Sequence, residues 1–128
     1  MTIIVICLII AAFTPLLAKA PLGYLQAKQE GGYDNNNPRA QQAGLSGLGA
    51  RALAAQNNAF EAFPTFAAGV LIALWAEANL ATVQLLCVLH IVARLCYLTF
   101  YLANLATLRS LSWMVGFGCA IALMALAL

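Results

Sequence analysis

Two apolar segments of the chain each carry a row of polar side chains at helical spacing. The row in the segment 50–76 consists of Arg51, Asn58 and Glu61. The row in the segment 79–105 consists of His90, Arg94, Tyr97, Tyr101 and Asn104. Side chains three, four or seven residues apart lie on the same face of a helix. The sequence therefore predicts two polar helix faces, which can meet only if the two helices are neighbours.

The charged members of these rows, Glu61 and Arg94, are expected to lie at the same depth. Each is about ten residues from the same end of its segment, or roughly 15 Å at 1.5 Å per residue. An ionisable side chain inside a membrane span costs about 2.5–3.5 kcal/mol, so by default it is paired and functional. We expect Glu61 and Arg94 to form an ion pair. A pair that merely holds two helices together remains an alternative.

The residue types of these rows, together with Arg109 before the last apolar segment, indicate which ligand they would bind. Arg51, Arg94 and Arg109 would bind carboxylates, Glu61 an ammonium group, and Asn58 an amide. Glutathione, a zwitterionic peptide with two carboxylates, one amine and a thiol, matches this set. A cation beside the thiol would lower the thiol pKa and raise the thiolate fraction. The pattern favours conjugation or reduction of a lipophilic electrophile that arrives from the bilayer.

The remaining side chains that are able to bind metals give a plainer prediction. His90 has no second ligand at a suitable spacing, and we interpret it as a hydrogen-bonded histidine of the core. The four cysteines lie in apolar runs without a metal-ligand spacing, and we interpret them as buried free thiols: Cys7, Cys87, Cys96 and Cys119. No metal site is predicted.

The composition restricts the class of protein that can hold these rows. The chain has 128 residues, of which 64% are hydrophobic and 8% charged, with a net charge of +2. A soluble domain carries about 25% charged residues, and a nucleic-acid binder needs clustered cations. The composition excludes both classes, as well as a disordered chain. An all-α integral membrane protein remains.

Four apolar segments are long enough to span a membrane, which predicts one membrane domain over residues 1–128, a four-helix bundle. The predicted helices are residues 3–25, 50–76, 79–105 and 109–128. The first is expected to remain in the protein, because no positive region precedes it as in a signal peptide. A polar loop over about 26–48 joins the first two helices, and short turns are expected near Glu77–Asn79 and Ala106–Leu108.

The cations predict the orientation of the bundle. Four of them flank or occupy the first connection, and Arg109 is at the third, whereas the second has only Glu77. The first and third connections share one side of the membrane, and the positive-inside rule makes that side cytoplasmic. Both termini are then expected outside.

Several motifs of this chain resemble those of the MAPEG family, the membrane-associated proteins in eicosanoid and glutathione metabolism. The motifs are Arg51-Ala52 followed by Asn58-Ala59-Phe60-Glu61-Ala62-Phe63-Pro64, the row Arg94, Tyr97 and Tyr101, and the pair Arg109-Ser110. The loop sequence Tyr33-Asp34-Asn35-Asn36-Asn37-Pro38-Arg39 is similar to the bacterial branch. The resemblance covers nearly the whole chain.

The resemblance implies a homotrimer in a bacterial inner membrane, with glutathione as co-substrate bound between protomers on the cytoplasmic side. It implies that Asn58 and Glu61 bind glutathione and that Tyr97 and Tyr101 contact the ligand. Arg109 resembles the arginine proposed to stabilise the thiolate. The chain departs from the eukaryotic members at Ala54, where they have a further arginine.

Three functions are compatible with these patterns. The first is a glutathione-dependent transferase or peroxidase that acts on a lipophilic small molecule. The alternative is a non-catalytic accessory subunit or lipid-binding scaffold, for which the small residues of the last helix allow close contact with a partner: Gly116, Gly118, Ala120 and Ala122. A transporter is disfavoured, because no inverted repeat or pair of broken helices is visible.

Overall fold

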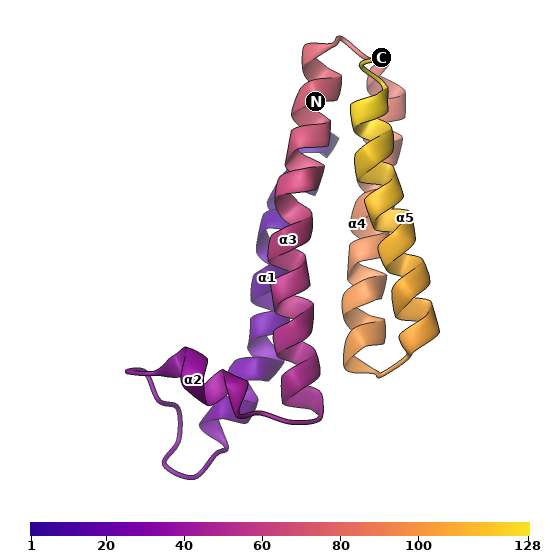
Figure 1. The fold of residues 1–128 in the computed structure, drawn as a ribbon. Coiled ribbons are helices and arrows are strands. Elements are labelled where there is room, and N and C mark those ends of the chain that lie inside the picture. Colours follow the sequence, from indigo (N-terminus) through magenta and orange to yellow (C-terminus); the bar gives the residue numbers. More distant parts are fainter.

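Four long helices and one short helix make up the structure, a computed structural model that describes residues 1–128. The long helices are α1 (Thr2–Ala27), α3 (Leu48–Trp75), α4 (Leu80–Leu102) and α5 (Ala106–Ala125), and the short one is α2 (Pro38–Ala43). All four long helices have the length and hydropathy to cross a membrane (Figure 1). The prediction of an all-α fold with four spans is confirmed.

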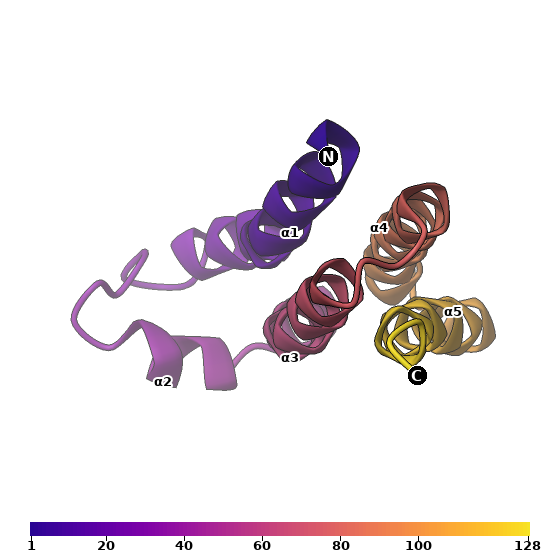
Figure 2. The same ribbon diagram turned by 90° about the horizontal axis from the view of Figure 1, so that it is seen from above.

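The helices run alternately up and down, so that their connections gather at two ends (Figure 1). Both termini and the turn between α3 and α4 lie at one end. The loop that contains α2 and the turn between α4 and α5 lie at the other, which we call the loop end. Seen from above, α3 lies between α1 on one side and the pair of α4 and α5 on the other (Figure 2). Helix α3 thus contacts every other long helix.

The core lies where α1, α3, α4 and α5 meet, and its side chains are small or aliphatic except for Phe66. It contains Ile4, Cys7, Ala11, Phe66, Val70, Ala73, Val83, Cys87, Ile91, Ala120 and Leu123. The outer faces carry large exposed apolar side chains such as Phe13, Leu71 and Met114. Such faces are stable in lipid but not in water.

The cysteines are free thiols, as predicted. Cys7, Cys87 and Cys119 are buried, whereas Cys96 is only half-buried. None of them forms a disulfide.

The turn between α4 and α5 lies closer to α4 than the sequence predicted. It consists of Ala103–Leu105, not Ala106–Leu108, and Asn104 has a φ of +61°. Asparagine enters this left-handed region more readily than other non-glycine residues. Asn104 therefore ends the helix instead of extending the polar row, and Arg109 lies in the first turns of α5.

The polar loop holds the short helix α2, which the sequence analysis did not predict. Proline is at its first position, where the missing N–H costs nothing. Gln26 at the end of α1 is fully buried and donates from Nε2 to the Pro38 carbonyl at 3.0 Å and to Oε1 of Gln41 at 3.1 Å. Gln41 in turn donates to the Gly32 carbonyl at 2.7 Å. Side-chain amides thus attach the loop to the end of α1.

Helices α3 and α5 cross at a glycine. A Cβ atom on Gly69 would lie 2.7 Å from the carbonyl oxygen of Ala120, a separation that real side chains do not reach. The predicted small-residue face of the last helix is therefore split. Gly116 and Ala120 are buried within the bundle, whereas Gly118 is exposed on the other side of α5.

Candidate functional site

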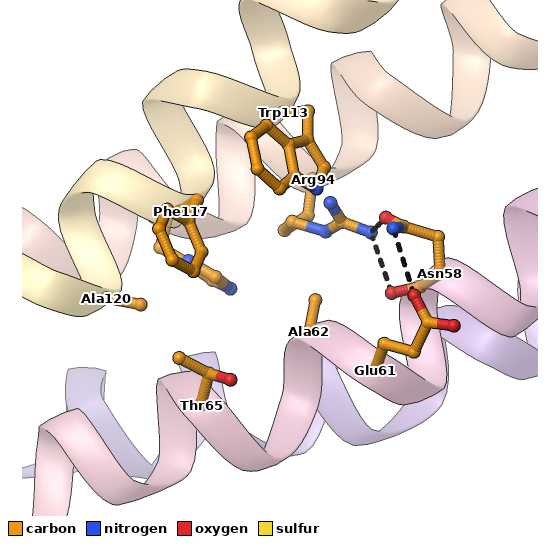
Figure 3. A pocket seen from close by; sticks show the side chains of 9 residues that line it. Asn58, Glu61, Ala62, Thr65, Arg94, Trp113, Phe117 and Ala120 are labelled. Atoms are coloured by element: carbon orange, nitrogen blue, oxygen red, sulfur yellow. Dashed lines mark hydrogen bonds between the residues drawn. The ribbon is translucent and has the colours of Figure 1, made fainter.

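Arg94 lies at the centre of the polar contacts between α3 and α4. Its side chain is 4% exposed, although it is a full positive charge inside a membrane span. Its Nη2 donates to Oδ1 of Asn58 at 2.7 Å and, more weakly, to the Asn58 carbonyl at 3.4 Å (Figure 3). The two polar rows do meet, as the sequence predicted.

The predicted ion pair between Glu61 and Arg94 is wrong. The structure has no direct contact between them; Asn58 lies between, donating from Nδ2 to Oε2 of Glu61 at 3.4 Å (Figure 3). Helical spacing puts Asn58 and Glu61 on one face but does not determine which of them a guanidinium one helix away will reach. Glu61 is left exposed, with its carboxylate free for another cation.

From Arg94 towards the loop end, four side chains stack in a row, with two tyrosine rings between two guanidinium groups. The Arg94 guanidinium lies over Tyr97, with Cζ 4.4 Å from the ring centroid, and Tyr97 packs edge-to-face on Tyr101 at 5.5 Å. The Arg109 guanidinium lies over Tyr101 at 4.6 Å. Cation–π contacts fix both guanidinium planes without neutralising their charge. We call these four residues the cation–tyrosine ladder.

Three members of the ladder, Tyr97, Tyr101 and Arg109, form one wall of a pocket at the loop end, of about 430 Å³. We call it the outer pocket. It is lined by Asn58, Tyr97, Tyr101, Arg109, Ser110, Trp113 and Met114. Pockets that hold small ligands measure about 300–1,000 Å³, so this one suits a tripeptide-sized molecule.

A second, smaller cavity of about 160 Å³ lies deeper between α3, α4 and α5. We call it the inner cavity. It is lined by Asn58, Glu61, Ala62, Thr65, His90, Arg94, Trp113, Phe117 and Ala120 (Figure 3). Asn58 and Trp113 belong to both linings, so the two spaces are neighbours.

Arg51 is the predicted site residue that the structure does not bring to either space. Its Nε donates to the carbonyl of Leu102 at 3.3 Å, where α4 ends. That carbonyl has no partner within the helix, and a guanidinium satisfies it well. Arg51 thus joins the loop ends of α3 and α4.

The prediction that His90 is a hydrogen-bonded core histidine is correct for one ring nitrogen only. His90 is buried, stacks on Phe66 and has Nδ1 2.8 Å from the Gly116 carbonyl. Its Nε2 has no hydrogen-bond partner.

The sequence analysis missed the contribution of α5 beyond Arg109 and Ser110. Trp113 and Phe117 follow Arg109 at helical spacing and stack on each other, with ring centroids 5.2 Å apart. The signal was available, since offsets of four place all three on one face. The same residues also fit an apolar membrane span, so the row is not distinct in the sequence.

A profile of the MAPEG family matches residues 3–128. The chain belongs to the MAPEG family. It is therefore a multi-pass integral membrane protein of the kind found in eicosanoid and glutathione metabolism. None of the curated proteins matches this MAPEG chain in a direct sequence comparison.

Proposed function

We propose that this MAPEG protein binds glutathione, or a similar anionic thiol peptide, in the outer pocket and either conjugates it through its sulfur to lipophilic electrophiles or uses it as the reductant for them. The observation that carries the proposal is the cation–tyrosine ladder along the wall of that pocket. Arg109 lines the pocket itself, and the Arg94 guanidinium lies just beyond it, over Tyr97 and bonded to Asn58, which both line the pocket.

The side chains around the pocket support each part of this ligand. Arg94 is already oriented by Asn58, and its charge is uncompensated by any contacting carboxylate, so it would attract a ligand carboxylate. Glu61, exposed beside Asn58, would attract the ligand ammonium group. Because Arg51 is engaged with Leu102 and Ala54 is apolar, α3 supplies no further cation.

Arg109 is the proposed catalytic residue. It is held over Tyr101 and partly exposed at the loop end of the pocket. A guanidinium next to the ligand sulfur favours the thiolate over the thiol. The thiolate electron pair would form a bond to an electrophilic carbon. In a substitution, the leaving group would depart with the electron pair of its broken bond; in an addition, the carbanion that results would take a proton from water. Ser110, adjacent in the chain, lines the same pocket.

We further propose that the protein is a homotrimer in a bacterial inner membrane, with the loop end in the cytoplasm. Three cations, Lys19, Lys28 and Arg39, lie in or near the loop. Arg51 and Arg109 lie in the first turn of α3 and of α5, at the same end, and this excess of positive charge supports the orientation. The exposed apolar faces supply surface both for lipid and for neighbouring protomers.

Calorimetric titration of glutathione into the purified protein tests the binding step. We expect saturable binding at millimolar glutathione or below. Replacing Arg109 by Ala should weaken binding about tenfold, as expected for one lost charge-assisted hydrogen bond. The matched control is Arg39→Ala, a loop cation that does not line the outer pocket. The absence of any saturable heat would contradict the proposal.

A non-catalytic scaffold remains the second candidate, and one observation favours it. Arg51 and Arg94 both bind groups of a neighbouring helix, as residues that only hold helices together would. A scaffold would be insensitive to glutathione, and its melting temperature would not rise when glutathione is added. The titration above therefore separates the two candidates.

A further inference from the structure

One buried polar atom is not used by the proposed function: Nε2 of His90. The side chain is 2% exposed, yet this nitrogen has no hydrogen-bond partner. The other ring nitrogen, Nδ1, faces the Gly116 carbonyl at 2.8 Å. A carbonyl can only accept, so Nδ1 carries the hydrogen, and Nε2 of the neutral ring is an acceptor. Burying such an acceptor without a donor costs free energy.

The ring is held so that Nε2 cannot turn away. Phe66 stacks on it with a centroid distance of 3.9 Å and an angle of 3° between the planes. The bond to Gly116 fixes the remaining rotation of the ring. A rigid acceptor of this kind is a preorganised binding group, since a ligand does not have to order it.

The inner cavity, which His90 lines, has the size for one small ligand with an apolar side and a polar side. Its volume is about 160 Å³, and a cavity of ~150 Å³ with apolar walls is known to hold benzene. Its apolar walls are Ala62, Trp113, Phe117 and Ala120 (Figure 3). The rest of the lining beside His90 is polar and consists of Asn58, Glu61, Thr65 and Arg94. Trp113 and Phe117 are themselves exposed on α5, so a ligand can reach the cavity past them.

We propose that the inner cavity is a second binding site, which takes a small uncharged compound with a hydroxyl group on an apolar body. Phenols and short alcohols are the chemical class. The hydroxyl donates to Nε2 of His90, and the ring or chain packs against Phe117 and Trp113. Because the cavity shares Asn58 and Trp113 with the outer pocket, such a ligand would lie beside a bound thiol; only this last link rests on the proposed function.

The first test uses the fact that the chain has a single histidine. Protein labelled with ¹⁵N-histidine, in buffer without glutathione or any other added thiol, is titrated with phenol, and the ¹⁵N resonance of Nε2 is followed. Anisole is the matched ligand, because it has the same ring and an ether oxygen in place of the hydroxyl. We expect a saturable shift of the Nε2 resonance with phenol and none with anisole.

Two results of this titration would overturn the proposal. In one, phenol leaves the resonance unchanged, which would mean that phenol does not reach Nε2. In the other, anisole shifts the resonance as much as phenol does. Neither result bears on glutathione, since no thiol ligand is added, and failure of glutathione binding leaves this titration unaffected.

The second test measures affinity. His90→Phe keeps a flat ring against Phe66 but removes the acceptor. We expect phenol to bind this variant about tenfold more weakly by calorimetry, whereas the affinity for anisole should change less than about twofold. Equal weakening for both ligands would contradict the hydrogen bond to His90. If the variant does not fold, the titration of the wild-type histidine alone decides.

Discussion

Arg94 illustrates how a charge can be kept inside a membrane bundle without a carboxylate in contact. Its guanidinium has one short bond to the Asn58 amide and a tyrosine ring beneath it, and the side chain is almost entirely buried. An amide oxygen and an aromatic face stabilise the cation but leave its charge uncompensated. Such an arrangement is suited to a site where an anionic ligand supplies the missing charge.

The first prediction concerns Asn58. Replacing it by Ala should lower the free energy of unfolding by about 1.5–3 kcal/mol, because it removes a hydrogen bond to a charged group and leaves Arg94 unpaired. Thermal denaturation in detergent without ligand measures this. Asn57→Ala is the matched control, since Asn57 is exposed and hydrogen-bonds to no partner in the fold. Similar losses for both variants would be inconsistent with the central place of Asn58.

Glu61 gives the converse prediction. Because its carboxylate is exposed and does not touch Arg94, Glu61→Gln should change the free energy of unfolding by less than about 0.5 kcal/mol. It should nevertheless weaken glutathione binding, since an ammonium group would lose its counter-charge. A large loss of stability in Glu61→Gln would indicate that Glu61 and Arg94 do form the direct ion pair that the sequence suggested.

Asp34 in the loop supplies a pH-dependent prediction outside the membrane. Its Oδ1 accepts from the backbone N–H of Asn37 at 2.9 Å and of Asn36 at 2.8 Å. These bonds, that of Asn37 above all, hold the pKa of the carboxyl below its usual value. A lowered pKa means that the loop contacts are intact above the ordinary pKa and are lost as the pH falls through the lowered one.

The amide resonances of Asn36 and Asn37 measure this titration. We expect both to move together with a midpoint below about 3.9, the value of a free aspartate. Asp34→Asn should abolish the movement. A midpoint at or above the ordinary value would show that the carboxylate is not held by these amides.

At the scale of elements, the close crossing of α3 and α5 keeps the inner cavity small and places Trp113 beside Asn58. Gly69 makes that crossing possible, because any side chain there would meet the backbone of Ala120. Gly116 of α5 allows a similar close approach to α4, because a Cβ atom on it would lie 3.2 Å from Cδ of Arg94. Glycine positions thus determine how far the polar side chains can approach one another.

The two glycines on opposite faces allow a matched comparison. Gly69→Ala should cost about 1–3 kcal/mol of stability through overpacking. Gly118→Ala should cost less than about 0.5 kcal/mol, since nothing lies within 4 Å of its added Cβ. Thermal denaturation of the two variants measures the difference. Equal stability of the two would mean that α3 and α5 are farther apart than described.

Much of this arrangement was predictable from spacing alone. The four spans and the two facing polar rows follow from helical periodicity and the length of a membrane span. Periodicity could not show that Asn58, one turn from Glu61, would accept the hydrogen bond from the Arg94 guanidinium. Nor could it find the partner of His90, because the Gly116 carbonyl is brought there by the packing of α4 against α5.

At the scale of the whole molecule, the polar groups are concentrated towards one end. The outer pocket, the loop with α2 and all six cations lie in the half nearer the loop end, whereas the opposite turn carries Glu77. The pocket is therefore placed to receive a water-soluble peptide from one side of the membrane. The apolar faces can admit a lipophilic partner from the bilayer.

Labelling of single cysteines tests the orientation. A membrane-impermeant thiol reagent should reach Ala76→Cys, at the end with the termini, in intact cells. It should reach Ser46→Cys, at the loop end, only in inverted vesicles, because the positive-inside rule places that end in the cytoplasm. Both positions are exposed. The reversed pattern would contradict the proposed orientation.

The most direct measurement of the central claim is the ultraviolet absorbance of the thiolate when glutathione is added to the purified protein at neutral pH. We predict a saturable thiolate signal that is lost in Arg109→Ala and absent when S-methylglutathione replaces glutathione. Glutathione that binds as a neutral thiol, or a thiolate signal unchanged in Arg109→Ala, would contradict it.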